Sequence, residues 1–172
     1  HADVIDGNAG DDILVGGLGD DELWGYLGFD VLVGDHATIL RAKQEVEPGV
    51  LAVRFERVES AFAAVGGDDL LVGDGEIQGD NPSEGGSDTL IGGTGNDRLF
   101  AMTQNPVHGS DPGNILLGDN GVEVRQDSSS TNDYNIFSTD PTFGGIDTIY
   151  GSTGVDIILG GSIGAEAQKG LP

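Results

Sequence analysis

Residues 7–33 read GNAGDDILVGGLGDDELWGYLGFDVLV, which divides into three consecutive nonapeptides. Each nonapeptide has glycine at its first and fourth places, aspartate at its sixth place and leucine at its eighth place. A fixed short period is the signature of a repeat architecture, in which each unit buries its apolar residue by stacking on its neighbours. We therefore number the places of this repeat from one to nine.

The same frame recurs later in the chain, between four interruptions. The further copies are residues 64–72, 83–91, 92–100, 109–117, 142–150 and 151–159, and the interruptions are residues 34–63, 73–82, 101–108 and 118–141. The eighth place is leucine or isoleucine in all nine copies. The sixth place is Asn114 in one copy and aspartate in the other eight: Asp12, Asp21, Asp30, Asp69, Asp88, Asp97, Asp147 and Asp156. We expect residues 1–172 to form a single domain built on these repeats.

The composition excludes several classes of protein. The 172 residues include 30 acidic and 7 basic side chains, for a net charge of −23. Such a chain repels nucleic acid and anionic membranes, and no apolar run is long enough to cross a bilayer. The absence of cysteine excludes disulfides and thiolate metal sites. The apolar residues recur in short clusters, which argues against a disordered chain. A folded chain with this net negative charge needs a positive counter-charge.

The nonapeptide resembles the RTX (repeats-in-toxin) hemolysin-type repeat, G-G-x-G-x-D-x-U-x. The resemblance covers about half of the chain, namely the nine copies above. It implies an all-β fold, a right-handed parallel β-roll or β-solenoid, in which each copy is half a turn. Six residues form a loop, three form a strand, and several Ca²⁺ ions lie between loops stacked on the same edge.

The residue types support this interpretation independently. Carboxylates and backbone carbonyls form a site of oxygen atoms alone, which favours Ca²⁺ over zinc or copper. A single aspartate in a glycine-rich turn usually caps its own backbone, but eight aspartates in register favour calcium. We therefore predict that the eight sixth-place aspartates are metal ligands, and that Asn114 weakens its sites because it is uncharged.

The half-turn geometry predicts which of these residues meet. Alternate copies lie on one edge, so Asp12 should face Asp30. If the interruptions leave this alternation intact, Asp21 should face Asp69, Asp30 should face Asp88, Asp69 should face Asp97, Asp97 should face Asp147, and Asn114 should lie between Asp88 and Asp156.

A Gly-Asp pair stands where the repeat stops at three of the interruptions. The acids are Asp35, Asp74 and Asp119, each directly after a glycine that follows an apolar triplet. Two interpretations remain open for them. They are either additional calcium ligands or caps of the turn by which the chain leaves the repeat.

The interruptions include two segments with β-like alternation of apolar and charged residues. Residues 37–47 and 50–60, around Pro48-Gly49, predict a hairpin with one buried face, and residues 118–141 predict a shorter one. The ninth place points out of the roll and is apolar in every copy. An exposed apolar stripe of that size is unfavourable. We therefore expect the inserted hairpins, or a neighbouring module, to cover one sheet face. The solvent exposure of Trp24, which holds a ninth place, should then report whether that face is covered.

These features favour a calcium-binding roll that folds on Ca²⁺ outside the cell and acts as a structural, secretion-supporting module of a secreted or cell-surface bacterial protein. The alternatives are a repeat segment of a surface adhesin that binds ice or another ligand, and an accessory domain of a secreted RTX hydrolase. The segment itself should not be an enzyme, since its three histidines lie in no catalytic motif. The expected partners are calcium and neighbouring modules of the same polypeptide. Because the sequence begins at His1, we expect it to be a segment of a longer polypeptide.

Overall fold

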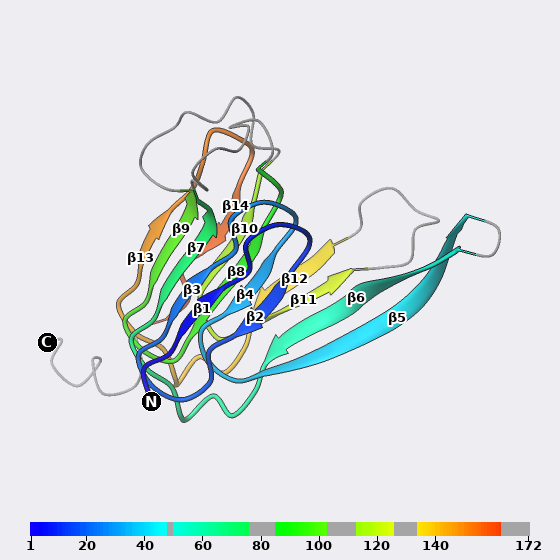
Figure 1. Cartoon of the computed structure of the whole chain (residues 1–172). Helices are drawn as coiled ribbons and strands as arrows, with labels where there is room; N and C mark the ends of the chain where they lie inside the picture. The colour runs from blue at the N-terminus through cyan, green and yellow to red at the C-terminus, as the bar shows by residue number, and fades with distance from the viewer. Residues whose placement is uncertain (48–49, 76–84, 103–112, 126–133, 163–172) are drawn as a thin grey trace, which may run out of the picture.

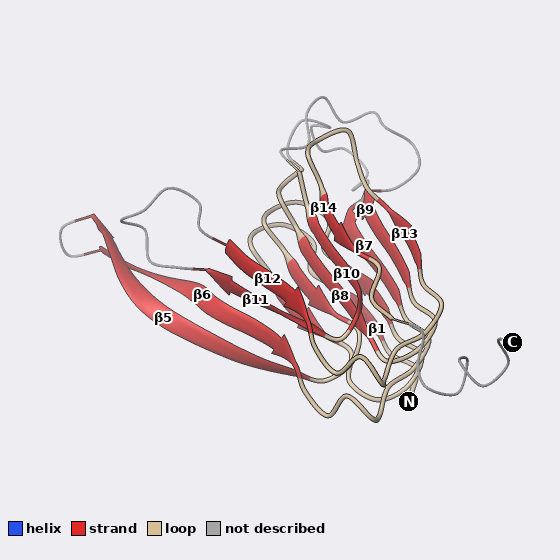
Figure 2. Ribbon diagram, turned by 180° about the vertical axis from the view of Figure 1, so that it is seen from behind, coloured by secondary structure: helices blue, strands red, loops and turns tan. Residues whose placement is uncertain are grey.

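The structure, a computed structural model, describes residues 1–47, 50–75, 85–102, 113–125 and 134–162. Within these ranges the chain forms fourteen β-strands and no helix (Figures 1 and 2). Consequently, none of the residues described here belongs to a helix that could cross a membrane. The all-β prediction is confirmed.

Ten short strands form the two parallel sheets of a β-roll. Successive copies of the repeat supply strands to the two sheets in turn, so neighbours within a sheet come from alternate copies. The first roll sheet has the order β1 (Val4–Asp6), β3 (Glu22–Trp24), β7 (Leu70–Asp74), β9 (Arg98–Met102) and β13 (Thr148–Tyr150). The second roll sheet has the order β14 (Ile157–Leu159), β10 (Ile115–Asp119), β8 (Thr89–Gly93), β4 (Val31–Val33) and β2 (Ile13–Val15).

The eighth-place side chains form the core between the two roll sheets. They stand in register from coil to coil, for example Leu23 beside Leu71 and Leu71 beside Leu99. A three-residue strand is too short to be stable alone, but in a parallel ladder each strand needs only one inward side chain. Leu14, Leu23, Leu32, Leu71, Leu90, Leu99 and Leu116 are all buried in this cluster.

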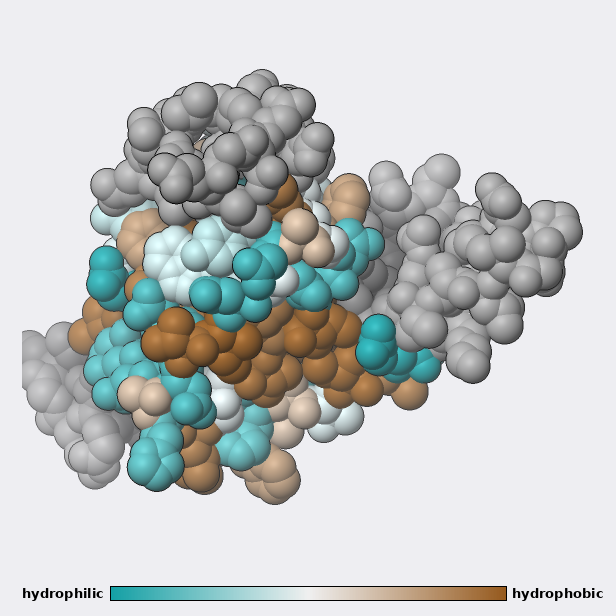
Figure 3. All heavy atoms as spheres, viewed as in Figure 1, coloured by the Kyte–Doolittle hydropathy of each residue, from teal (hydrophilic) through white to brown (hydrophobic). Residues whose placement is uncertain are grey.

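The polar residues of the repeat lie in the loops at both edges of the roll. Figure 3 shows this separation as an apolar band over the strands, with hydrophilic side chains above and below it. Each loop is joined to the next coil by regular backbone bonds. The first-place glycine donates to the carbonyl at the end of the neighbouring strand, as Gly7 does to Trp24 at 2.8 Å. The acids are therefore held at fixed positions relative to the coils on either side.

The interrupted copies begin earlier than the sequence pattern indicates. Gly34 takes the first place of the copy that contains Asp69, because its N–H bonds to the next coil as that of Gly16 does. The hairpin thus leaves the loop between the second and third places, and residues 64–65, which the pattern placed first and second, belong to the insertion. The corresponding first-place residues of the other interrupted copies are Gly73, Ala101 and Gly118.

The insertions leave the alternation between sheets intact. Strand β7 follows the first hairpin and pairs with β3, while β13 follows the last insertion and pairs with β9. Most of the two remaining insertions lies outside the described residues.

The two predicted hairpins join into one four-stranded antiparallel sheet, which we call the hairpin sheet. Its order is β12 (Tyr134–Ser138), β11 (Gly121–Arg125), β6 (Val50–Ser60) and β5 (Ala37–Glu47). Strand β11 pairs with β6 through residues more than 60 positions apart, such as Val122 and Glu59. Figures 1 and 2 both show β5 and β6 extending well beyond the roll.

The hairpin sheet covers the outer face of the second roll sheet. Val58 of β6 is fully buried against Val33, Ile91 and Leu117, with Ile39 and Ile136 beside them. This is the covering that the apolar ninth place predicts. Trp24 is the wrong reporter for it, however. Alternation puts the ninth place of that copy on the first roll sheet, where the Trp24 indole donates to the Glu22 carboxylate at 2.8 Å.

Candidate metal centre

The sixth-place residues stand at the junction of loop and strand and form two rows, one along each edge of the roll. Within a row, the backbone N–H of each residue donates to Oδ1 of the sixth-place residue on the next coil. In the first row Asp3 donates to Asp21, Asp21 to Asp69, Asp69 to Asp97 and Asp97 to Asp147, at 2.7, 2.8, 2.8 and 2.9 Å. In the second row Asp12 donates to Asp30, Asp30 to Asp88, Asp88 to Asn114 and Asn114 to Asp156, at 2.8, 2.9, 2.7 and 2.9 Å.

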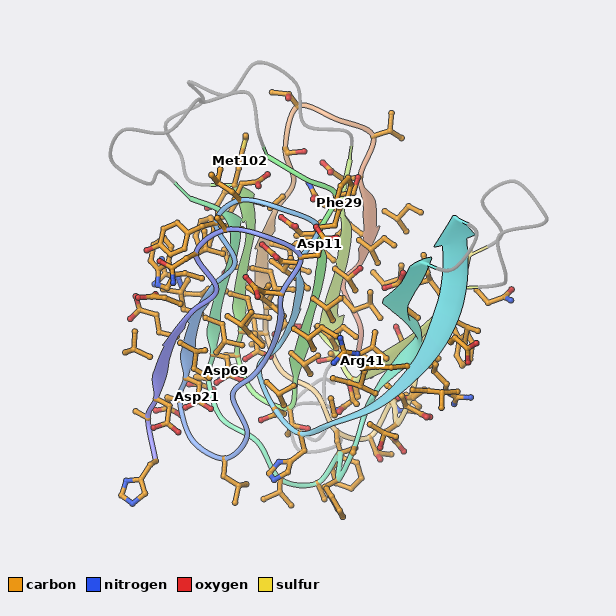
Figure 4. The ribbon with its side chains drawn as sticks, turned by 45° about the vertical axis from the view of Figure 1, so that its right-hand side comes forward. Asp11, Asp21, Phe29, Arg41, Asp69 and Met102 are labelled. Carbon is orange, nitrogen blue, oxygen red and sulfur yellow. The ribbon has the colours of Figure 1, made fainter. Side chains whose placement is uncertain are left out.

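The structure therefore brings together every pair that the half-turn geometry predicts, including the pairs separated by insertions. Figure 4 shows Asp21 and Asp69 one above the other at one edge, and Asp11 with Phe29 at the opposite edge. Asp3 was missed by the sequence analysis. Residues 1–6 take the fourth to ninth places of a copy, with His1 where most copies have glycine, and the signal for this copy is the Asp-x-Ile spacing of places six and eight.

The second carboxylate oxygen of most row members has no hydrogen-bond partner. Oδ2 is buried and unpartnered in Asp12, Asp21, Asp30, Asp69, Asp97 and Asp147. Leaving a buried charged oxygen unsatisfied is costly, and native proteins rarely do so without a ligand or ion. Six such atoms at equivalent positions indicate a shared function.

A backbone carbonyl of the next coil lies beside five of these six oxygens, those of Asp12, Asp21, Asp30, Asp69 and Asp97. An ideal Cβ built on Gly7 would lie 2.9 Å from Asp12 Oδ2 and 2.9 Å from the Gly25 carbonyl. The same two atom types crowd the first-place glycine of other copies. These are Gly16, Gly25, Gly34, Gly73 and Gly92, where the carbonyl again belongs to the first place of the next coil on that edge. Glycine is thus required there, because a methyl group would fill a small space between oxygen atoms.

Burial raises the pKa of the row carboxyls. The pKa is about 6 for Asp30 and Asp147, about 7 for Asp69 and about 9 for Asp97. The backbone N–H bond that each accepts lowers the pKa, and neighbouring carboxylates raise it further. Asp97 is the extreme case because it is fully buried between Asp69 and Asp147. In their ionised form these groups need a positive partner.

The end of the second row differs from the rest. The Asn114 side chain accepts the N–H of Asp88 as an aspartate would, and its amide donates to Ser152 Oγ at 3.2 Å. Asp156 Oδ2 accepts the N–H of Ser152 at 2.7 Å. Asn114 therefore preserves the backbone geometry of the row but supplies no charge to it.

The three Gly-Asp acids lie at the bases of the insertions. Oδ1 of Asp35 accepts the N–H of Gly67, across the hairpin from it, at 3.2 Å. Asp74 bonds to Gly86 at 3.2 Å and Asp119 to Gly145 at 2.9 Å in the same way. Each carboxylate thus bridges the second and fourth places of an interrupted loop, as the capping interpretation predicts. The calcium-ligand interpretation of the same acids remains a prediction.

The oxygen atoms available here fit a hard cation. Each space combines a carboxylate oxygen with a backbone carbonyl, and Ca²⁺ accepts six to eight such oxygen ligands. Among the described residues, no three acidic or histidine side chains converge on one point. Carbonyls must therefore supply much of any coordination shell, with the sixth-place aspartates supplying the charge.

Three stretches of the chain, residues 1–32, 83–105 and 142–162, match the family model of the RTX calcium-binding nonapeptide repeat, in four copies. The chain contains RTX calcium-binding nonapeptide repeats. The RTX match begins at residue 1, in agreement with Asp3 as the sixth place of a half copy. No curated protein and no solved structure matches the chain. The RTX repeats identify a calcium-binding module, whose repeats are structural and not catalytic.

Proposed function

We propose that this RTX segment folds when it binds Ca²⁺ and supports the structure and secretion of a larger bacterial protein outside the cell. The observation that carries the proposal is the pair of buried rows in which Asp Oδ2 atoms lie unpartnered beside backbone carbonyls. We assign the eight sixth-place aspartates of the full copies as ligands, together with Asp3, and we expect several ions between the stacked loops.

The physical basis is a balance between repulsion and ordering. Without metal, rows of carboxylates repel one another, and ordering the chain costs on the order of 1–2 kcal/mol per residue. Each bound ion stabilises the fold by about 2.7 kcal/mol when its free concentration is ~100 times its dissociation constant. Calcium sites of extracellular modules commonly have dissociation constants of roughly 0.1–1 mM. Sites of that strength would be filled outside a cell and empty in the cytosol.

Circular dichroism during a calcium titration, with magnesium as the control, tests this proposal. We expect β-structure to appear cooperatively with Ca²⁺ and to disappear when EGTA is added. Mg²⁺ should be far less effective, because it demands short octahedral distances and gives up its water reluctantly. A spectrum that is fully ordered in EGTA, or that responds equally to both ions, would contradict the proposal.

A further inference from the structure

The acids at the second place of the interrupted loops differ from the second-place residues of the continuous ones. In four continuous loops the second-place residues Gly17, Gly93, Asn8 and Tyr26 have positive φ angles of 108°, 112°, 73° and 75°, whereas Ser152 of the last copy does not. Asp35, Asp74 and Asp119 are not in this left-handed region, so there the chain turns out of the loop and into the insertion. Their side chains nevertheless point inward and are at most 3% exposed.

Asp35 lies between two coils of the first edge. Its Oδ1 accepts the N–H of Gly67 in its own loop, and its Oδ2 accepts the N–H of Thr94 in the next coil at 2.6 Å. A Cβ on Gly66 or on Gly93 would overlap the carboxylate, which shows how closely the two loops enclose it. Asp119 is held in the same manner, by the N–H groups of Gly145 and Ser162.

Each of these acids shares its loop with a sixth-place aspartate. Asp69, which is 2% exposed and has an unpartnered Oδ2, completes the loop that Asp35 begins. Two carboxylates buried in one loop require a positive partner when both are ionised. A carboxylate that accepts two N–H groups still has lone pairs for a metal.

We propose that Asp35, Asp74 and Asp119 are second carboxylate ligands of the calcium sites in the hairpin-bearing loops, beside Asp69, Asp88 and Asp147 respectively. This rests on the proposed calcium-binding function and deepens it. Calcium sites become tighter as the number of charged ligands grows. The roll therefore has two classes of site, and the tighter class lies at the bases of the insertions. Calcium binding there also fixes the two chain ends of each insertion.

Asp35→Asn is the principal variant, because it removes the charge and keeps a side chain of the same size with a hydrogen-bond-accepting oxygen. Asp68→Asn is the matched control. Asp68 stands in the same loop, and its Oδ1 also accepts an N–H from the next coil, that of Asn96 at 2.8 Å. Asp68 is exposed, however, and stands outside the enclosed space between coils. Both variants lose one negative charge, so long-range electrostatic effects are equal.

Calcium binding is measured by isothermal titration calorimetry on the whole chain, and the folded state at saturating calcium is checked by circular dichroism. We expect Asp35→Asn to weaken the tightest class of site by ~tenfold or more, and Asp68→Asn to stay within about twofold of the unaltered chain. Asp74→Asn and Asp119→Asn are made as separate single variants. If one of the three variants fails to fold, the other two still test the proposal.

Binding isotherms of all three second-place variants that coincide with that of Asp68→Asn would overturn the proposal and leave these acids as hydrogen-bond caps only. The outcome is distinct from failure of the proposed function, in which the unaltered chain itself binds no calcium.

Discussion

At the scale of single residues, the buried carboxylate rows make folding depend on a positive partner. Asp69 and Asp97 are 2% and 0% exposed, and each places an unpartnered oxygen beside a carbonyl of the next coil. An ionised carboxylate in such a place is strongly destabilising unless a proton or a cation balances it. The same residues therefore oppose folding in the absence of metal and drive it in the presence of metal.

The first-place glycines define the size of each proposed site, which gives a direct test. A Cβ on Gly34 would fall between Asp69 Oδ2 and the Gly92 carbonyl. We expect Gly34→Ala to raise the calcium concentration at the folding midpoint by roughly tenfold or more, equivalent to ~1.4 kcal/mol. Gly160→Ala is the control, because Gly160 directly follows the ninth place of the last copy, as a first-place glycine does, but has no atom within 4 Å of its ideal Cβ. Equal midpoints for the two variants, measured by circular dichroism, would refute the assignment of these spaces to calcium.

The metal-free chain is expected to be most stable in acid. Burial raises the pKa of Asp30 and Asp147 to about 6, of Asp69 to about 7 and of Asp97 to about 9, against about 3.9 in an unfolded chain. Between about pH 4 and pH 9 the folded chain thus holds protons that the unfolded chain has released. The stability of the metal-free fold is therefore greatest below about pH 4 and falls as the pH rises through this window.

Far-UV circular dichroism of the metal-free chain from pH 4 to pH 9 checks this dependence. We expect more β-structure at pH 4 than at pH 8. With calcium present the trend should reverse, because protons compete with the ion and raise the calcium midpoint in acid. A metal-free chain that gains order as the pH rises would contradict the prediction.

At the scale of elements, the hairpin sheet is the cover of one roll face. Strands β6 and β5 bring Val58 and Ile39 against the apolar ninth-place side chains of the second roll sheet. A bare parallel sheet with this composition would expose an apolar stripe and tend to associate. The insertions therefore complete the fold of the roll, although they interrupt its repeat.

A charge placed in this interface should release the hairpin sheet. We expect Val58→Asp, at a fully buried position, to lower the free energy of unfolding in saturating calcium by on the order of 3 kcal/mol. It should also increase the fluorescence of a hydrophobic dye such as ANS. Leu40→Asp is the control, since Leu40 lies on the neighbouring strand but is 53% exposed, and a surface change of this kind stays within about 0.5 kcal/mol. If the two variants behave alike, the hairpin sheet does not cover the roll.

At the scale of the whole molecule, the repulsion from a net charge of −23 favours an expanded chain unless bound cations balance part of that charge. Calcium in the two rows would remove much of the repulsion at the points where it is strongest. A compact chain of this length has a radius of gyration of about 16 Å, against roughly 44 Å for an unfolded one. The projecting hairpin of β5 and β6 should raise the compact value slightly.

Small-angle X-ray scattering with and without calcium measures this change. We expect the radius of gyration to fall from near the unfolded value in EGTA to near the compact value at millimolar calcium. Magnesium at the same ionic strength controls for simple screening of charge. A radius that is already compact in EGTA, or that contracts equally in magnesium, would show that calcium does not control the size of the chain.

Much of the site was predictable from the sequence because the repeat is encoded locally. Each nonapeptide stacks on copies of itself. One nonapeptide therefore specifies the loop, the inward apolar side chain at the eighth place, such as Leu14, and the aspartate at the sixth place. The pairing of Asp12 with Asp30 follows from that period alone. Asp3 escaped detection because His1 stands at the fourth place of its copy, where eight of the nine other copies have glycine. The true start of the copy containing Asp69 was hidden by the insertion of a hairpin inside its loop.

The sequence by itself determined the period, the apolar interior of the roll and the two rows of acids, because these depend on contacts between copies of one short motif. Only the tertiary structure decided how the insertions are used. The pairing of β11 with β6 joins residues more than 60 positions apart, and no local pattern specifies such a pair. No local pattern specifies the inward orientation of the Asp35 side chain either. It depends on a φ angle outside the left-handed region and on the N–H groups of Gly67 and Thr94, which come from two coils.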